Sequence, residues 1–240
     1  MNILAIGNSF SQDATRYIHR IARCDGINMD VVNLYIGGCP IDLHFRNMLS
    51  EAKDYELEFN GELTKFKVSL KEALLNREWD YITIQQASHL SYKYESYQPY
   101  LNEVCDYIKK LCPKAKLLIH QTWAYENESI RLNDAGYESH EKMFSDIEKA
   151  YEKAAKEINA EFTIPSGKLI EKLFENGIEK VHRDTFHLRR GLSRYAVGLL
   201  WYTLLSGNDI ENNTFCDFDE EVTKEEIEIA KKCVKEITEG

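Results

Sequence analysis

Short apolar runs alternate along the chain with longer stretches in which apolar residues recur at helical spacing. The apolar runs predict five buried strands, at Asn2–Ile6, Met29–Tyr35, Tyr81–Gln85, Lys116–His120 and Glu161–Ile164. Helical spacing is clearest over residues 100–111, which end before Pro113, and over residues 143–158. Strands and helices that alternate in this way favour an α/β fold, with one parallel sheet and helices on both of its faces.

Local signals predict the remaining elements of the first half. A helix with apolar residues at positions 14, 17, 18, 21 and 22 is expected after the first strand, with its end near Gly26. Asn60-Gly61 separates the alternating segments Tyr55–Phe59 and Glu62–Lys67, and this dipeptide favours a β-hairpin because both turn positions need positive φ. We expect this small hairpin to be an insertion at the edge of the domain, preceded by an irregular stretch.

The second half ends in helices. Besides a helix over Ser69–Arg77, the pattern predicts a short helix from Ser166 to near Gly177 and two further helices that close the chain. The last of these begins at Thr223-x-x-Glu226, which has the spacing of a capping box. Since the chain contains no internal repeat, low-complexity tract or linker, we expect residues 1–240 to form a single domain.

The balance of charged and apolar residues excludes several classes of protein. The 240 residues carry 30 basic and 40 acidic side chains, a formal net charge of −10, and no long basic stripe, so we expect no nucleic-acid partner. No run reaches the roughly 18–20 apolar residues of a membrane span, and the N-terminus lacks the basic region of a signal peptide. The six cysteines show no CxxC pair and are expected to be reduced thiols of a cytoplasmic protein without membrane partners.

The candidate chemistry lies in the loops that follow the strands, because ligands of open α/β sheets bind beyond the carboxyl ends of the strands. Hydroxyl and amide groups with few charges fill these loops, which are Gly7–Ser11, Gly37–Pro40, Gln86–His89 and Gln121–Trp123. The first loop has a single glycine and matches neither the G-x-G-x-x-G fingerprint nor the P-loop. This composition favours binding of an oxyanion over binding of a nucleotide.

A second group of reactive side chains precedes the penultimate helix. Asp184 stands three residues before His187, so its carboxylate can orient the ring through Nδ1 and leave Nε2 free as a base. Placed against Ser9 of the first loop, this pair forms a candidate Ser-His-Asp triad. A metal site formed by His182, Asp184 and His187 is the alternative from the same segment, since imidazole and carboxylate suit zinc.

Together these blocks resemble the SGNH (GDSL-like) hydrolases. The resemblance covers most of the chain and is carried by Gly7-Asn8-Ser9-Phe10-Ser11, by Gly38 after the second strand and by Asp184-x-x-His187. It implies a flavodoxin-like three-layer α/β/α sandwich around a five-stranded parallel sheet. It also implies that Ser9 is the nucleophile, His187 the general base and acid, and Asp184 the group that orients His187. The backbone N–H groups of Ser9 and Gly38 would be oxyanion donors.

The chain departs from the pattern of this family at two blocks. Asn8 stands where the family usually has Asp before the serine, and Gln85-Gln86-Ala87-Ser88 replaces Gly-x-Asn-Asp, whose Asn donates to the oxyanion. A side-chain amide can supply the same N–H, so Gln86 is the first candidate for this third donor and Ser88 the second. Trp123, after the fourth strand, is expected either to stack on a sugar ring or to close the core.

The sequence therefore predicts a serine ester hydrolase without a metal or an organic cofactor. The polar, aromatic rim favours a short acyl ester, such as an O-acetyl group on a carbohydrate or a related small metabolite. The expected partner is accordingly a small-molecule or oligosaccharide ester. A thioesterase or lysophospholipase and a catalytically inactive binding domain remain alternatives, and a homo-oligomer is left open. An α/β-hydrolase is excluded, because the chain has no G-x-S-x-G elbow.

Overall fold

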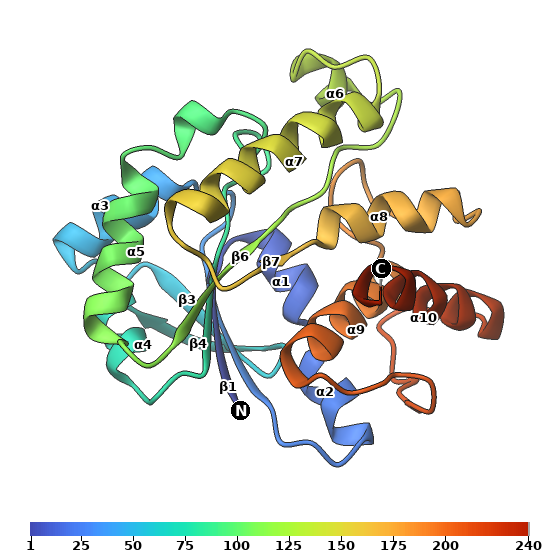
Figure 1. Cartoon of the computed structure of the whole chain (residues 1–240), viewed down its shortest axis with the longest axis horizontal. Helices are drawn as coiled ribbons and strands as arrows, with labels where there is room; N and C mark the ends of the chain where they lie inside the picture. The colour runs from blue at the N-terminus through green and yellow to red at the C-terminus, as the bar shows by residue number, and fades with distance from the viewer. Residues whose placement is uncertain (240) are drawn as a thin grey trace.

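The computed structural model describes residues 1–239 and arranges them around one seven-stranded sheet (Figure 1). The strands stand in the order β4-β3-β2-β1-β5-β6-β7. Five neighbouring strands are parallel, namely β2 (Asp30–Tyr35), β1 (Asn2–Gly7), β5 (Tyr81–Ile84), β6 (Lys116–His120) and β7 (Thr163–Ile164). The predicted α/β fold with a five-stranded parallel sheet in flavodoxin-like order is confirmed. The strand order reverses at β1, where such folds place their ligands.

The predicted hairpin is present and lengthens the sheet at its edge. It consists of β3 (Tyr55–Phe59) and β4 (Glu62–Val68), joined at Asn60 and Gly61 with φ angles of 54° and 84°. Because β3 pairs antiparallel with β2, the hairpin belongs to the sheet and is not a separate flap. Only glycine fits at position 61, since a Cβ there would lie 2.2 Å from the carbonyl oxygen of Arg16.

The single helix expected after β1 is divided in two. α1 (Ser9–Thr15) and α2 (Ile18–Cys24) are separated at Tyr17, which has φ −113° and ψ −8°. The ring of Tyr17 is buried, and its hydroxyl donates a hydrogen bond to the carbonyl oxygen of Arg190 at 2.6 Å. This long-range contact, which has no signal in the local sequence, accounts for the break.

The stretch between β2 and the hairpin is helical, which corrects the prediction of an irregular segment. α3 (Ile41–Ser50) begins after Pro40, and its buried side chains are Ile41, His44 and Asn47. Two of these three inward positions are polar, so the helical period is hidden when only apolar residues are counted. Inside the core, Nδ1 of His44 lies 3.0 Å from the hydroxyl of Tyr55, whereas its Nε2 has no partner in the described residues.

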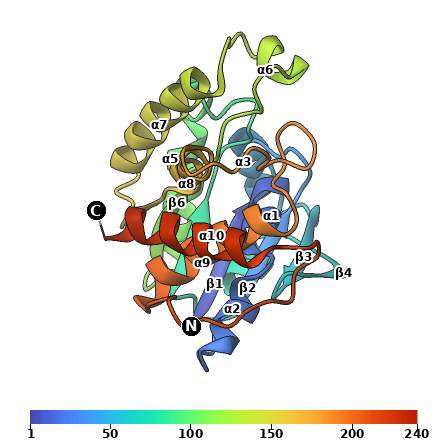
Figure 2. The ribbon, with the colours of Figure 1, turned by 90° about the vertical axis from the view of Figure 1, so that its right-hand side faces the viewer.

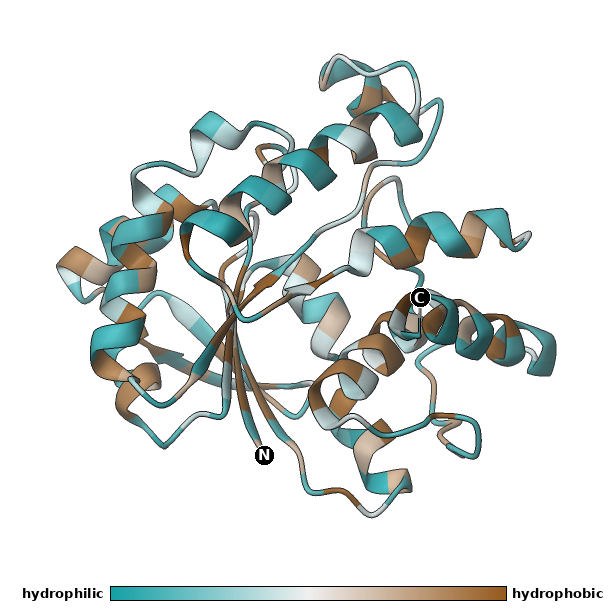
Figure 3. Cartoon of the chain, viewed as in Figure 1, coloured by the Kyte–Doolittle hydropathy of each residue, from teal (hydrophilic) through white to brown (hydrophobic). Residues whose placement is uncertain are grey.

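Helices cover both faces of the sheet and complete the three layers (Figures 1 and 2). One side carries α3, α4 (Leu70–Leu75) and α5 (Tyr100–Leu111); the other carries α1, α2 and α9 (Leu192–Ser206), with α10 (Lys224–Thr238) packed outside α9. Apolar residues concentrate on the central strands, and the outward faces of the helices are hydrophilic (Figure 3). Within residues 1–239, no helix has both the length and the apolar character that a membrane span needs.

Two long connections rise beyond the carboxyl ends of the central strands. The connection after β5 contains a short 3-10 helix, η1 (Tyr94–Ser96), and the connection after β6 contains α6 (Ile130–Asp134). The second leads into α7 (His140–Glu157), and β7 is followed by α8 (Ser166–Glu175). In Figure 1, α6 lies at the top of the molecule, far from the N-terminus of β1. These connections therefore frame the end of the sheet at which the candidate residues gather.

Candidate active site

The candidate nucleophile opens the first helix. β1 ends at Gly7, and the Asn8 side chain accepts a hydrogen bond from the Phe10 N–H at 3.0 Å, which caps α1 and makes Ser9 its first residue. Position 7 requires glycine, because a Cβ there would lie 2.5 Å from Ser11 Oγ. The tight strand-to-helix turn thus presents the Ser9 hydroxyl at the carboxyl edge of the sheet.

His187 faces Ser9 from the loop that precedes α9. Its Nε2 lies 2.9 Å from Ser9 Oγ, and its Nδ1 lies 2.7 Å from Asp184 Oδ2. Since an ionised carboxylate only accepts hydrogen bonds, Nδ1 carries the proton and Nε2 presents its lone pair to the serine hydroxyl. The structure therefore brings together the three residues that the sequence analysis selected, in the geometry of a Ser-His-Asp triad.

Asp184 is held ionised by its own loop. Partial burial alone would raise its pKa, but the N–H of His187 (2.8 Å), the His187 ring and the N–H of Phe186 (3.0 Å) all donate to the carboxylate and lower its pKa to about 2. The two backbone bonds also wrap the chain around the carboxylate. The group that orients His187 is thus charged and fixed across the whole neutral range.

Asp13, which the sequence analysis missed, joins the helix of Ser9 to the loop of His187. Its carboxylate is fully buried and accepts from Nη1 of Arg183 (2.9 Å to each oxygen), from the N–H of Leu188 (2.9 Å) and from Nε of Arg194 (2.8 Å). Because Asp13 lies one helical turn after Ser9, these bonds set the position of the base relative to the nucleophile. The feature of the sequence that could have revealed Asp13 is the presence of an acidic residue on the inward face of α1.

Asn8 holds the loop after β2 against the same site. Its side-chain amide donates to the Cys39 carbonyl oxygen at 3.1 Å, which places Gly38 beside the start of α1. Gly38 has φ +63°, is exposed, and its N–H has no acceptor in residues 1–239. An oxyanion donor needs such a free N–H, and the role of Gly38 as a donor stays a prediction.

A family model described as "Domain of unknown function (DUF4886)" matches residues 2–237. The chain belongs to the DUF4886 family. A crystal structure of a DUF4886 family protein from Bacteroides uniformis ATCC 8492 is 31% identical, covers 100% of this chain and 95% of the other, and has a TM-score of 0.91. A comparison with curated proteins finds no match.

Two more distant structures share the fold of this DUF4886 chain. A protein from Slackia heliotrinireducens, described as a candidate SGNH hydrolase, is 23% identical over 85% of this chain and 98% of its own, with a TM-score of 0.58. A candidate GDSL-like lipase from Parabacteroides merdae ATCC 43184 is 15% identical over 86% of this chain and 95% of its own, with a TM-score of 0.57. The DUF4886 chain is therefore structurally similar to SGNH (GDSL-like) hydrolases.

Gln86 does not offer a free donor in this DUF4886 structure. Its amide nitrogen already donates to the carbonyl oxygen and hydroxyl of Ser96, at 3.2 and 3.1 Å, and its oxygen accepts from the N–H groups of Ile41 and Ala87. The side chain is fully buried and joins the connection after β5 to the start of α3, which corrects the expectation that it donates to an oxyanion. Ser88 accepts from the Tyr125 hydroxyl at 3.0 Å and keeps its own proton to donate.

Trp123 closes the core and does not present a face for a sugar. It is fully buried, and its ring stacks on Phe10 with centroids 4.2 Å apart and planes 5° apart. Its Nε1 donates to the carbonyl oxygen of Phe186 at 2.7 Å. Of the two roles that the sequence analysis left open, the structure supports packing, and the bond to Phe186 also holds the loop of Asp184 and His187.

A buried chain of polar side chains lies beneath the site and was also missed. The Gln85 amide donates to Asn8 Oδ1 (3.0 Å), while its oxygen lies 2.6 Å from Nδ1 of His120, whose Nε2 lies 2.9 Å from Ser166 Oγ. Burial lowers the pKa of His120 to about 3, so the ring is neutral. Nδ1–H then donates to Gln85, and Ser166 donates to Nε2. Every member is satisfied, which fixes the amide of Asn8.

The metal alternative receives no geometric support. Residues 1–239 contain no group of three or more His, Cys, Asp or Glu side chains arranged to hold a metal ion. His182 is buried, burial lowers its pKa to about 4, and its nitrogens have no partner in the described part of the chain. Cys39, beside Gly38, is also buried, and burial raises the pKa of its thiol to about 12, which leaves it un-ionised.

Proposed function

We propose that this chain is a serine ester hydrolase in which Ser9, His187 and Asp184 act as a catalytic triad. The observation that carries the proposal is the continuous hydrogen-bonded line from Asp184 through the His187 ring to Ser9 Oγ. His187 is within hydrogen-bond distance of both Ser9 and Asp184, which is the arrangement that activates a serine hydroxyl.

The chemistry proceeds in two displacements. His187 Nε2 takes the proton of Ser9 as Oγ forms a bond to the ester carbonyl carbon, and the N–H groups of Ser9 and Gly38, with Ser88 as the third candidate, receive the oxyanion. The C–O bond to the alcohol then breaks, and His187 returns the proton to the departing oxygen. Water, deprotonated by His187, repeats the attack on the acyl-enzyme and releases the acid, while Ser9 regains its proton.

The proposed substrate is a short acyl ester, such as an O-acetyl group on a carbohydrate or a related small metabolite. A cavity of about 490 Å³ next to the loop of Asp184 and His187 supports a compact alcohol half, and three residues that carry hydroxyl groups, Tyr92, Tyr125 and Thr185, are among those that line it. A thioesterase or lysophospholipase would need a longer apolar channel for the acyl chain. The alcohol half is therefore expected to carry most of the recognition.

Hydrolysis of p-nitrophenyl esters from acetate to octanoate, compared between wild type, Ser9→Ala and Ser50→Ala, tests this function. Ser50 is an exposed serine at the end of α3 and serves as the matched control. We expect the acetate to be the best substrate and Ser9→Ala to lose at least about 10⁴-fold in kcat, with Ser50→Ala unchanged. Rates that rise with chain length would favour the thioesterase or lysophospholipase; absence of turnover would leave the inactive binding domain.

A further inference from the structure

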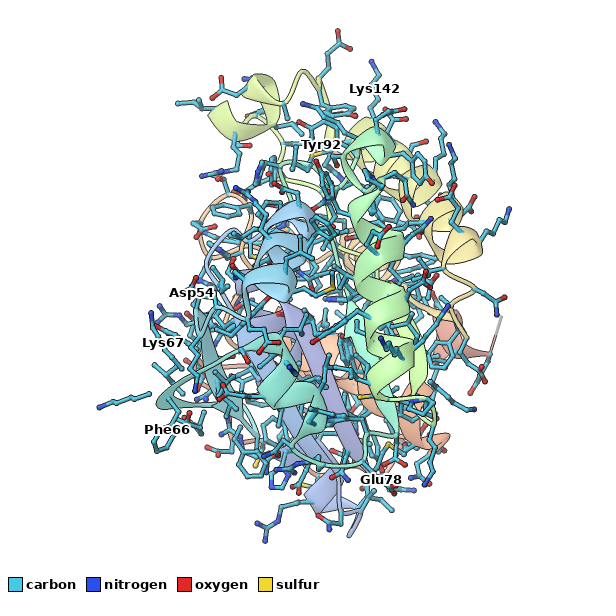
Figure 4. The ribbon with its side chains drawn as sticks, turned by 90° about the vertical axis from the view of Figure 1, so that its left-hand side faces the viewer. Asp54, Phe66, Lys67, Glu78, Tyr92 and Lys142 are labelled. Carbon is cyan, nitrogen blue, oxygen red and sulfur yellow. The ribbon has the colours of Figure 1, made fainter. Side chains whose placement is uncertain are left out.

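The cavity beside the catalytic loop is built from three separate segments. It is lined by residues of the β5–η1 connection, of the α6 connection and of the catalytic loop itself, including His89, Tyr92, Tyr125, Arg131, Asp134 and Thr185. Figure 4 places Tyr92 at the end of the molecule that carries α6, opposite the end that carries Glu78. Thr185 lies between Asp184 and His187 in the chain, so one wall of the cavity is the catalytic loop.

Arg131 is the cation of this cavity and stands next to the base. Its guanidinium carbon lies 3.9 Å from the centroid of the Phe186 ring, and that ring lies 3.8 Å, centroid to centroid, from the ring of His187. Arg131 has no carboxylate within ion-pair distance in residues 1–239, and its side chain is exposed to solvent. A guanidinium that stacks on an aromatic ring keeps its N–H groups free for a planar anion.

Besides Arg131, a second cation lies near the cavity, although the chain as a whole is acidic. Lys93 lies over the ring of Tyr92, with Nζ 5.1 Å from the centroid. Burial, and then the charges of Lys93 and Arg131, lower the pKa of His89. Asp134 is the opposing charge within the cavity lining, three residues after Arg131 and not ion-paired with it.

The side of the site on which the cavity opens identifies the half of the ester that it receives. His187 must deliver a proton to the departing alcohol oxygen, so the alcohol lies against the histidine. The cavity wall formed by Thr185, with Phe186 stacked between Arg131 and His187, is on this side. The carbonyl oxygen of the bound ester would instead face the N–H groups of Ser9 and Gly38, the proposed oxyanion donors.

We propose that the cavity binds an anionic group, a carboxylate or a phosphate, on the alcohol half of the substrate, and that Arg131 is the residue that determines this specificity. The inference rests on the proposed esterase function, because it uses His187 to assign the two halves of the ester. Arg131 donates to two oxygens of the anion in the fork geometry that guanidinium favours. The substrate class is then a short acyl ester of an acidic alcohol.

The test compares two acetyl esters that differ only in charge, 4-acetoxybenzoate and 4-acetoxybenzamide, with 4-acetoxyphenyl phosphate as the phosphate arm. Wild type is expected to prefer the anionic esters, and Arg131→Gln to lose about tenfold in kcat/KM on them while the amide is unaffected. Asp134→Asn is expected to raise kcat/KM on the anionic esters. Arg23→Gln, which removes an exposed arginine of α2 from the far end of the molecule, controls for net charge.

Equal losses on the charged and the neutral ester would overturn the proposal, because Arg131 would then act through Phe186 on His187. Absence of any preference in wild type would also overturn it. If no ester is turned over, the proposed esterase function fails, and a binding measurement still tests whether Arg131 selects an anion. In that case, 4-hydroxybenzoate and 4-hydroxybenzamide are titrated by calorimetry into Ser9→Ala, with and without Arg131→Gln. Tighter binding of the carboxylate that Arg131→Gln abolishes would support the proposal. Equal binding of the two compounds to Ser9→Ala would overturn it.

Discussion

The two sides of the loop that carries Asp184 and His187 are held in different ways. On the inner side, the fully buried Asp13 accepts hydrogen bonds from two arginines and a backbone N–H, and Trp123 donates to the Phe186 carbonyl. On the outer side, the loop borders an open cavity where Arg131 touches it only through stacking on Phe186. The inner side fixes the position of His187, whereas the outer side leaves the guanidinium of Arg131 free to bind a ligand.

This difference predicts how substitutions divide between stability, rate and specificity. Buried, charge-assisted hydrogen bonds are costly to break, because the remaining partner keeps its charge in a place that water does not reach. Exposed residues of the rim make no buried, charge-assisted hydrogen bonds, so their replacement leaves the fold intact. Changes beneath the loop should therefore reduce stability and kcat together, whereas changes on the rim should act on kcat/KM for particular substrates.

The largest effect is expected from Asp13→Asn. The substitution removes the carboxylate partner of Arg183 and one of the two carboxylate partners of Arg194, which keeps its ion pair with Asp219. We expect the free energy of unfolding to fall by about 3 kcal/mol, with a parallel loss of kcat. Urea unfolding and ester turnover measure the two. Asp42→Asn, which breaks only the exposed pair with Arg46, is the control and should cost less than about 1 kcal/mol. Equal losses from both variants would contradict the division between the two sides.

The contrast also explains which features could be predicted from the sequence. Strands, hairpin and capping box are local patterns, and the proximity of Ser9, Asp184 and His187 could be predicted because Ser9 and Asp184-x-x-His187 resemble a known family. Asp13 has partners 170 and 181 residues away, and only the folded chain brings them together. The role of Gln86 was assigned wrongly because residue type gives no side-chain direction, and its amide donates to Ser96.

For each single histidine, a smaller effect than that of Asp13→Asn is expected from pH, and it comes from buried rings. Burial lowers the pKa of His120 and His44 to about 3 and that of His182 to about 4, against a usual 6.5. The unfolded chain binds these protons below pH 6.5 while the folded chain does not, so stability falls as the pH drops from about 6.5 toward 4. Each histidine contributes a slope of up to about 1.4 kcal/mol per pH unit.

His120→Gln and His44→Gln test this dependence. Each variant is expected to show a flatter dependence of the free energy of unfolding on pH between 6 and 4.5, measured by urea titration at several pH values. His120→Gln should in addition lower kcat, because it alters the hydrogen-bonded chain through Gln85 that fixes Asn8. Slopes equal to that of wild type in both variants would show that neither ring remains neutral in the folded state at these pH values.

The smallest effect is expected from Ile130→Ser on the outer side. Ile130 lines the cavity and is 79% exposed, so its side chain gives up little buried surface when it is replaced. The free energy of unfolding should change by less than about 0.5 kcal/mol, and kcat should stay the same, because no bond to Ser9, His187 or Asp184 is altered. Only KM for esters with a bulky alcohol half should shift, by a few-fold, while KM for methyl acetate should not. A loss of kcat on methyl acetate would mean that α6 takes part in positioning Ser9, His187 and Asp184. Residues of the rim would then affect the rate, as the buried residues beneath the loop are expected to do.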